Sequence, residues 1–526
     1  MLSVNKTTIF WFRQDLRLSD NPGLLAAASH GAVMPIYILD DEAAATFKMG
    51  AASRWWLHHS LKKLNESLND KLNVYEGNSE DVILNIIKNN KVDAVYWNRC
   101  YEPLRIKEDT FLKTLLQNKN IECKTFNASL LWEPWEVVKS DHSAYKVFTP
   151  FYRQALKTAA PRNLLPVPKK LVLLEDKNNT TKIRLLSKLA DADEVQGVDG
   201  AQELSVQKLL DAPSTGATSQ LAASVEVRKK SIQELNLLPS NPWYTPIEKQ
   251  WEIGEKAAQK KLIDFLNHGL LNYTENRDYP DKTNFSKLSP HLHFGEISPH
   301  QIWHTTQKKA IGISNLKKDG DHFLRALVWR EFSYSMLYHF PDLPSKNFKA
   351  KFDHFPWQHN DLFLKAWQKG QTGYPLVDAG MRELWQTGTM HNRVRMIAAS
   401  FLVKNLLIDW RHGEAWFWDC LLDADLASNS FNWQWVAGSG ADASPYFRIF
   451  NPTTQGERFD KEGHYTRRFV PEISQLPNRF LFKPWEAPDS VLTAAGIILG
   501  ETYPQPIINL QDSRDRALDA YFTSLQ

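Results

Sequence analysis

The first 130 residues alternate short β-rich runs with helical patterns, and this alternation limits the choice of fold more than any other feature of the chain. Between two of the runs, leucines recur at helical spacing and form one apolar stripe, Leu57, Leu61, Leu64 and Leu68. Strands that alternate with helices predict a parallel, doubly wound sheet, whose ligands bind at the carboxyl ends of the strands. We therefore predict an α/β domain over residues 1–130. The strand-like runs are 7–13, 33–39, 73–78, 93–98 and 121–127.

A polar stretch separates this domain from a second, helical half. From about residue 165 the chain is rich in small and polar side chains, as in "DAPSTGATSQLAAS", and we assign residues 131–240 to a long, partly ordered inter-domain linker. Residues 241–480 carry helix-period segments separated by Pro and Gly, which predicts an all-α domain. Residues 481–526 then form a C-terminal extension.

Composition excludes several classes of protein. The 526 residues suggest two or three domains, and the net charge of +3 neither demands nor excludes a polyanionic partner. Cys100, Cys123 and Cys420 are an odd number without CxxC spacing, so we expect neither a disulfide framework nor a metal site. No apolar run is long enough to cross a bilayer and no leader pattern opens the chain, so we expect a cytoplasmic monomer without membrane association.

Tryptophan is unusually abundant, at 19 residues. A single buried Trp is often core filling, but the set as a whole needs a further explanation. The clearest case is "NWQW", where Trp433 and Trp435 flank one glutamine.

A glycine-rich stretch follows that cluster and imitates a dinucleotide fingerprint. Gly438 to Ala443 reads G-x-G-x-x-A, and Asp460 stands about where a ribose-binding acid would. A true fingerprint opens a helix inside a βαβ unit, whereas Pro445 and an extended-looking run follow here. We therefore predict no dinucleotide-binding fold at this stretch.

Five motifs in order resemble the photolyase/cryptochrome family, and within it the bacterial cyclobutane pyrimidine dimer photolyases, class I-like. The motifs are "FWFRQDLRLSDNP" (10–22), "SKLSPHLHFGEISP" (286–299), "TGYPLVDAGMREL" (372–384), "MHNRVRMIAASFLVKNLLIDW" (390–410) and "NWQWVAGSGADASPYFRIFNPTTQGERFD" (432–460). The resemblance implies FAD as cofactor, an antenna-binding α/β domain, and light-driven repair of UV-damaged DNA by electron transfer from reduced FAD to a flipped-out dimer.

The resemblance also implies a set of cofactor contacts. Asn429 would lie beside the reactive flavin nitrogen, and Arg395 would pair with Asp423, since a buried carboxylate needs a counter-charge. Phe285 stands where relatives carry a small hydroxyl residue, so we expect weaker FAD retention. The expected FAD contacts are Tyr273, Phe285, Ser286, Lys287, Leu288, Ser289, Arg330, Arg395, Asp423, Ala424, Asp425 and Asn429.

The tryptophans divide into two groups by the same resemblance. Trp357, Trp410 and Trp433 match an electron-hopping chain and, with Asn429, are the expected catalytic residues. Trp329 and Trp435 match a pair that stacks on an extruded dimer. The expected substrate and DNA contacts are Arg277, Ala326, Trp329, Arg330, Asn392, Arg393, Met396, Trp435, Arg448 and Gln455.

Ala326 departs from the pattern of repair-active relatives, which carry a glutamate there that hydrogen-bonds the dimer. Loss of this bond predicts slower repair, at a cost of about 1–3 kcal/mol. It also supports a second hypothesis, that the protein is a blue-light photoreceptor with reduced or lost repair. A (6-4) photolyase fits the motifs less well, and a non-photochemical oxidoreductase would not need the DNA-facing arginines.

The sequence leaves the identity of the second chromophore undecided. "YWNRCYEPLRIKED" (96–109) lies where an antenna would dock, and Glu102 fits the family pattern. Leu104 and Arg105 replace an amide and an acid found in folate-using relatives. Methenyltetrahydrofolate, a deazaflavin and an empty site therefore all remain possible.

Overall fold

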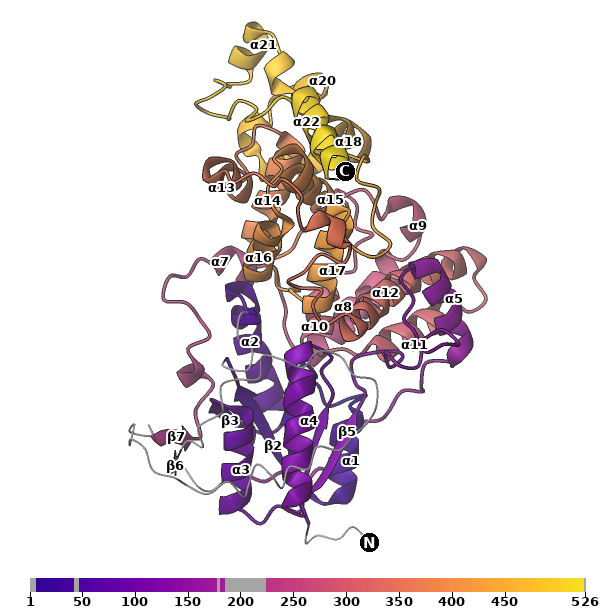
Figure 1. The fold of residues 1–526 in the computed structure, drawn as a ribbon, viewed down its shortest axis with the longest axis vertical. Coiled ribbons are helices and arrows are strands. Elements are labelled where there is room, and N and C mark those ends of the chain that lie inside the picture. Colours follow the sequence, from indigo (N-terminus) through magenta and orange to yellow (C-terminus); the bar gives the residue numbers. More distant parts are fainter. Residues whose placement is uncertain (1–5, 42–46, 177–179, 185–223, 525–526) are drawn as a thin grey trace.

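The structure, a computed structural model, describes residues 6–41, 47–176, 180–184 and 224–524. Figure 1 shows an α/β half at the bottom and a helical half above it. The predicted fold class is confirmed: a doubly wound parallel sheet precedes a helical region. Within the described ranges, no helix has both the length and the apolar character needed to cross a membrane.

The sheet contains five parallel strands in the order β3-β2-β1-β4-β5. Alternate residues of β1 point to opposite faces, so Phe10 packs with α1 and α2 whereas Ile9 packs with α3 and α4. Apolar residues on both faces are the reason that the strands read as almost continuous hydrophobic runs. The elements are β1 Thr7–Phe12, α1 Pro22–His30, β2 Ala32–Leu39, α2 Ala51–Ser67, β3 Asn73–Glu76, α3 Ser79–Asn89, β4 Ala94–Asn98, α4 Pro103–Asn118 and β5 Glu122–Phe126.

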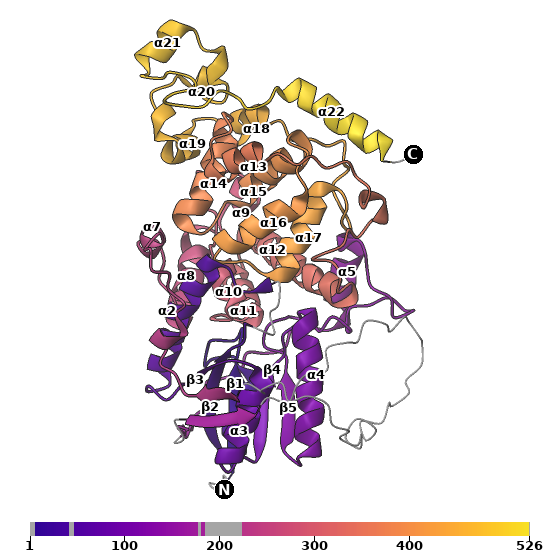
Figure 2. The ribbon, with the colours of Figure 1, turned by 60° about the vertical axis from the view of Figure 1, so that its left-hand side comes forward.

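Helices of 4 to 26 residues make up the other half, which Figure 2 shows above the sheet. Many of them pack around two hydrophobic clusters. A short π-helical segment, Phe401–Asn405, joins two of them. The helices are α7 Thr245–Glu248, α8 Glu255–His268, α9 Tyr273–Asn276, α10 Ser289–His293, α11 Pro299–Ala310, α12 Ser314–His339, α13 Asp361–Lys369, α14 Pro375–Thr387, α15 Asn392–Ser400, α16 Trp410–Cys420, α17 Leu426–Ala437, α18 Pro452–Phe459, α19 His464–Phe469, α20 Asn478–Leu481, α21 Asp489–Ala494 and α22 Leu510–Thr523.

The segment between the two halves contains regular structure. Helix α5, Phe148–Thr158, buries Phe148, Phe151 and Ala155 in the same cluster as α12. Further along, β6 Thr180–Arg184 pairs antiparallel with β7 Ser224–Arg228. Residues 185–223, which include much of the polar stretch, lie outside the described residues. The part of the chain near α5 therefore belongs to the helical core.

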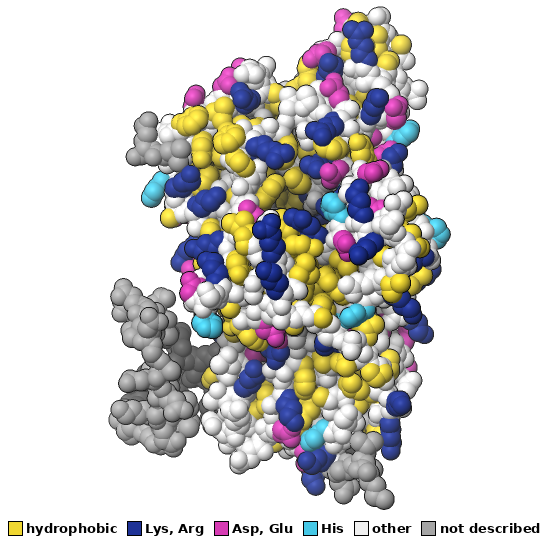
Figure 3. Space-filling view, turned by 90° about the vertical axis from the view of Figure 1, so that its right-hand side faces the viewer, with side chains coloured by type: hydrophobic (Ala, Val, Ile, Leu, Met, Phe, Trp, Pro, Cys, Tyr) yellow, Lys and Arg dark blue, Asp and Glu magenta, His cyan; other side chains and the backbone are white. Residues whose placement is uncertain are grey.

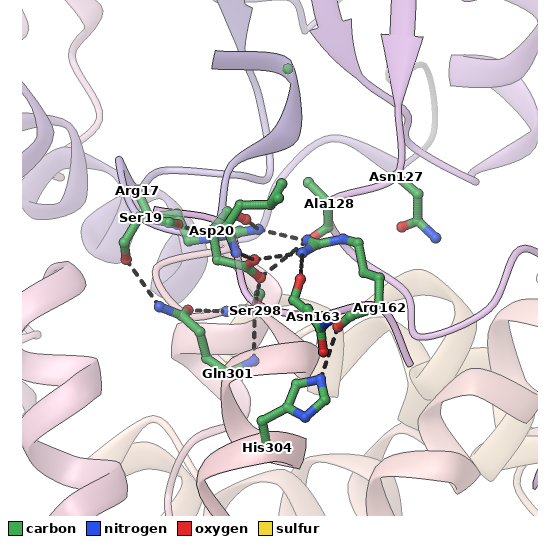
Figure 4. Close-up of polar contacts among 12 residues, drawn as sticks. Arg17, Ser19, Asp20, Asn127, Ala128, Arg162, Asn163, Ser298, Gln301 and His304 are labelled. Atoms are coloured by element: carbon green, nitrogen blue, oxygen red, sulfur yellow. Dashed lines mark hydrogen bonds and ion pairs between the residues drawn. The ribbon is translucent and has the colours of Figure 1, made fainter. Parts of the chain in front are cut away.

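A network of polar contacts joins the two halves (Figure 4). Arg17, in the loop after β1, is fully buried and donates to the carbonyl of Gly295 at 2.8 Å. Arg162 pairs with Asp20 at 2.5 Å, and the Arg162 carbonyl is 2.8 Å from the ring of His304 on α11. The loop after β1 thus rests on the start of the helical half, at the carboxyl edge of the sheet.

Candidate functional site

The loop before α10 offers free backbone donors. Lys287 has a left-handed backbone with φ 52°, and Leu288 follows in the right-handed helical region. This sequence of conformations turns successive N–H groups toward one side and forms an anion-binding nest. Among the described residues, none accepts a hydrogen bond from the N–H groups of residues 285–288. Asn284 anchors the loop by donating to the carbonyls of Gly269 and Leu271 at 2.7 and 2.9 Å. A nest of this kind, next to the hydroxyl-bearing Ser286 and Ser289, suits an anionic group such as the expected pyrophosphate.

A cleft of about 320 Å³ opens beside this loop, between it and α8. Lys261 and Lys287 both line the cleft. Burial and the charge of Lys287 lower the pKa of Lys261, and burial also lowers the pKa of Lys287. Two partly desolvated ammonium groups give this end of the loop a positive potential that favours phosphate. Phe285, which replaces the usual hydroxyl residue, lies edge-on to the ring of His391 at 5.5 Å.

An ion pair lies just before the start of α17. Arg395 of α15 donates to both carboxylate oxygens of Asp423, at 3.1 and 3.0 Å, and to the carbonyl of Met390 at 2.7 Å. Ala424 is buried between Asp423 and the helix cap. Asp425 caps α17 by accepting from the N–H of Ser428 at 2.7 Å. The pair and the cap together fix the turn that leads into Asn429.

Asp425 is buried and remains ionised. Tyr334 donates a hydrogen bond to it, His293 lies 3.9 Å away, and Arg330 adds a positive charge. Burial alone would raise the pKa of Asp425, but these neighbours lower it to about 2. Arg330 donates to the carbonyl of Ser129 at 2.8 Å, and its guanidinium lies 4.6 Å from the Tyr334 ring. Arg330 therefore belongs to the surroundings of Asp425.

The side chain of Asn429 has a defined orientation. Its amide nitrogen donates to the backbone carbonyl of Glu414 at 3.1 Å, which leaves the amide oxygen without a partner among the described residues. The neighbouring Ser430 hydroxyl donates to the side chain of Glu414. Burial raises the pKa of Glu414 to about 8, so this carboxyl group is mostly neutral at pH 7. The amide oxygen of Asn429 is therefore free to accept a hydrogen bond from a bound group.

The three tryptophans of the expected electron chain lie in the helical half at different depths. Trp433 is almost fully buried, and a Cβ on Gly413 would come within 2.1 Å of its ring, so only glycine permits this close packing with α16. Trp410 is fully buried and donates to Asn347 at 3.0 Å. Trp357 is half-buried beside Phe355, at 4.4 Å between ring centroids.

One further tryptophan joins this group. Trp367 of α13 is fully buried, with its ring centroid 6.2 Å from that of Trp433, and sequence reasoning did not single it out. Its position shortly before the "TGYP" motif was the only signal available.

The two expected substrate-stacking residues are half-exposed tryptophans on neighbouring helices. Trp329 lies on α12 and Trp435 on α17, and the two helices pack together. Ala326 precedes Trp329 by almost one turn of α12. One face of Trp329 is covered by Phe148 of α5, with ring centroids 3.6 Å apart and planes 7° from parallel. Phe148 was not predicted, because it fell within the expected linker.

Basic and apolar side chains surround a hollow in the helical half (Figure 3). Arg277 lies over the ring of Tyr273, with its guanidinium carbon 5.4 Å from the ring centroid. Arg393 pairs with Asp278 at 2.6 Å and covers the Phe459 ring. The remaining expected contacts have accessible side chains and come from α15, α18 and the loop between α17 and α18: Asn392, Met396, Arg448 and Gln455. The described residues contain no group of His, Cys, Asp and Glu that could hold a metal ion.

Comparison with known proteins relates both halves of the chain to one group of proteins. Residues 323–523 match the family model described as the FAD binding domain of DNA photolyase, and residues 8–170 match the model described as DNA photolyase. A deoxyribodipyrimidine photo-lyase of Agrobacterium fabrum is 44% identical over 98% of this chain and 97% of its own length. Cryptochrome-1 of Arabidopsis thaliana is 35% identical over 98% of this chain and 70% of its own length.

A solved structure gives the same result at the level of the fold, but corrects the expected class. A bacterial class III photolyase from Agrobacterium tumefaciens is 42% identical, with a TM-score of 0.85 over 99% of this chain and 98% of that chain. The class I-like assignment is therefore not supported. Relatives named photolyase and cryptochrome both match over nearly the whole chain, so the motifs identify the family and not the class.

Proposed function

Because the chain belongs to the photolyase/cryptochrome family, we propose that it is a deoxyribodipyrimidine photo-lyase, an enzyme that uses light to split cyclobutane pyrimidine dimers in UV-damaged DNA. When bound in its reduced form, FAD would supply the electron that opens the cyclobutane ring and would recover it afterwards, so the reaction involves no net redox change. The protein binds and orients cofactor and substrate and keeps water from between them.

Helices α12 and α17 carry this proposal, because each places a half-exposed tryptophan close to buried polar groups. On α12, Trp329 directly precedes Arg330, whose guanidinium lies near Asp425. On α17, Trp435 lies six residues after Asn429, whose amide oxygen accepts no hydrogen bond from the described residues. A pyrimidine dimer could thus stack on the faces of the two indoles, and the polar groups nearby could hold the cofactor.

The cofactor contacts divide by the part of FAD that they would hold. Ser286, Lys287, Leu288 and Ser289 would offer amides and hydroxyls to the pyrophosphate, and Phe285 directly precedes them. Tyr273, at the start of α9, would be a further contact. Asp423, Ala424 and Asp425, with Arg395 and Arg330, form a charged rim for the ring system. Asn429 offers an acceptor oxygen, which would stabilise a protonated flavin nitrogen.

Trp357, Trp410 and Trp433 would supply electrons from the surface to the cofactor. Indole is among the most easily oxidised side chains, and of these three Trp357 is half-buried whereas Trp410 and Trp433 are buried.

DNA would bind across the surface that carries three of the expected arginine contacts. Arg277, Arg393 and Arg448 suit phosphate oxygens on either side of a lesion, and an affinity of this origin falls steeply with salt. Asn392, Met396 and Gln455 would lie against the damaged strand. At the lesion itself, Ala326 supplies no hydrogen bond, so repair should proceed more slowly than with a glutamate there.

A second function of a different class is a blue-light photoreceptor. Ala326 is the specific observation that favours it, and a cryptochrome is 35% identical over 98% of this chain. The paired tryptophans Trp329 and Trp435 favour repair, because a photoreceptor has no need of a dimer-stacking pocket.

An antenna chromophore would dock at the carboxyl edge of the sheet. Glu102 occupies the N-cap position of α4 there and accepts from the side chain of Gln14 at 3.2 Å. Arg105 lies 3.4 Å from Glu108, so its charge is compensated within the helix. Methenyltetrahydrofolate and a deazaflavin are both candidates, and mass spectrometry of an extract of the purified protein would identify the chromophore.

The test of the proposed function is repair of a dimer-containing oligothymidine by the reduced protein under blue light, followed as recovery of thymine absorbance. Ala326→Glu restores a hydrogen bond to the lesion and should raise the repair rate by roughly fivefold or more. Ala326→Leu is the matched control, because it adds similar bulk but no acceptor and should not raise the rate.

Two outcomes separate the candidate functions. Recovery in the parent, faster in the glutamate variant, supports a photolyase with a weakened lesion contact. No recovery in the parent or the glutamate variant, with normal flavin photoreduction in both, would overturn the repair proposal and favour the photoreceptor.

A further inference from the structure

One face of the Trp329 ring is covered by an aromatic side chain that is distant in the sequence. Phe148, at the start of α5, is 1% exposed and stacks on the half-exposed Trp329 ring, with centroids 3.6 Å apart and an interplanar angle of 7°. Arg325, on α12, extends this layer, since its guanidinium lies 5.3 Å from the Phe148 ring and 5.2 Å from the Tyr152 ring. One face of the Trp329 indole is therefore filled by protein.

Phe148 is in turn held by a loop of the helical half. The residue before α5, Val147, has no side chain that could cap the helix. Asp442, 294 residues further along, accepts a hydrogen bond from the Phe148 N–H at 3.0 Å. A carboxylate at a helix N-terminus satisfies a free donor and interacts favourably with the helix dipole. Asp442 reaches this position with a left-handed backbone, φ 47°, which a short Asp side chain tolerates.

The same loop is attached to α17 beside the other half-exposed tryptophan. The N–H of Ser444 donates to the carbonyl of Trp435 at 3.3 Å, and the N–H of Gly440 donates to the carbonyl of Gln434 at 3.0 Å. Residues 438–444 therefore connect Trp435 to Phe148, and through Phe148 to Trp329. This is the glycine-rich stretch that imitates a dinucleotide fingerprint, and its role here is structural.

We propose that Phe148 and Asp442 form a rear brace that fixes Trp329 relative to Trp435, so that the affinity for a pyrimidine dimer depends on two residues that do not touch it. The inference rests on the proposed function, in which both tryptophans stack on the dimer. Two fixed flat faces suit two pyrimidine rings locked together, and an indole that can rotate loses part of this complementarity. Phe148 and Asp442 are thus positioning residues.

The brace predicts a defined pattern of dimer affinities. Phe148→Ala removes the stack and should weaken binding of a dimer-containing oligonucleotide by roughly fivefold. Asp442→Ala removes the cap and should weaken it by about three- to fivefold, whereas Asp442→Asn keeps an acceptor and should bind nearly as the parent does. Affinity for undamaged DNA and flavin content should not change in any of these variants.

Phe151→Ala is the matched control. Phe151 lies on the same helix, is equally buried and packs 5.1 Å from Phe332, but makes no ring contact with Trp329 among the described residues. A general loosening of α5 should affect this variant as much as Phe148→Ala. The experiment therefore measures affinity for dimer-containing and undamaged oligonucleotides in all variants, and hydrogen exchange of residues 325–332 without DNA.

Selective loss of dimer affinity in Phe148→Ala and Asp442→Ala, with faster exchange around Trp329, would support the brace. Equal loss in Phe151→Ala, or full affinity in Phe148→Ala, would overturn it. A parent protein that binds dimer-containing and undamaged DNA equally well would contradict the proposed function instead. Hydrogen exchange still tests the brace in that case, since unchanged exchange in Asp442→Ala would show that Asp442 does not hold Trp329.

Discussion

Glu414 belongs to none of the motifs that identified the site, yet it contacts two residues of the central helix. Its backbone carbonyl orients Asn429, and its side chain accepts from Ser430. The pair Arg395 and Asp423 was predictable, because motif residues implied both partners. Glu414 and Trp367 were not, since their importance comes from contacts with α17 that no local spacing reveals.

The burial of Glu414 predicts a dependence of stability on pH. Burial raises its pKa from 4.5 to about 8, so the folded protein keeps a proton that the unfolded chain releases within this window. Glu414 therefore makes the protein less stable as pH rises from about 4.5 to about 8. Glu414→Gln cannot ionise, and its free energy of unfolding relative to the parent should increase by about 1 kcal/mol or more between pH 5 and pH 8, measured in urea.

The comparison between variant and parent is needed because other buried carboxyl groups titrate in the same range. Burial also raises the pKa of Glu331 to about 7, and that contribution cancels in the difference. Parallel stability curves for parent and Glu414→Gln would contradict the prediction.

At the scale of elements, prediction succeeded where one pattern decided the structure. The sheet was predictable, because strands buried on both faces alternate with amphipathic helices such as α2. Helix α5 was not recognised, although Phe148, Phe151 and Ala155 recur at helical spacing. Its apolar stripe covers only part of a short helix, and the partner that buries it, α12, lies more than 150 residues away. Tertiary contacts of this kind leave no local signal.

The last helix, α22, covers an aromatic cluster near Trp357. Tyr521 stacks on Tyr446 at 4.7 Å with planes 9° apart, and Ala517 is fully buried beneath it. Tyr521→Ala should therefore lower the free energy of unfolding by about 2 kcal/mol, measured by urea denaturation. The neighbouring Phe522 is 57% exposed, so Phe522→Ala should change stability by less than about 0.5 kcal/mol. Equal effects of the two substitutions would mean that α22 does not stabilise this surface.

At the scale of the whole molecule, the contact between the two halves was not predictable from either half. The loop after β1 carries a motif that the family resemblance identified, but nothing in the sequence showed that it rests on the turn after α10. The N–H of Leu16 donates to the carbonyl of Phe294 at 3.0 Å, and Arg17 donates to Gly295. Because the helical half holds the expected flavin contacts and the sheet edge the expected antenna site, this junction sets the distance between them.

Gly295 is the residue on which this close approach depends. It has a left-handed backbone with φ +66°, and a Cβ there would lie 2.1 Å from the carbonyl oxygen of Gln14. Gly295→Ala must therefore either strain the turn or separate the halves, and should lower the free energy of unfolding by about 3 kcal/mol or more. Gly312 has a similar backbone, φ +77°, but a Cβ there would have no atom within 4 Å, so Gly312→Ala should cost only about 1 kcal/mol. Calorimetry would show whether Gly295→Ala also splits one unfolding transition into two, as separation of the halves requires. Equal losses of unfolding free energy in the two variants would mean that the close approach at Gly295 does not contribute to stability.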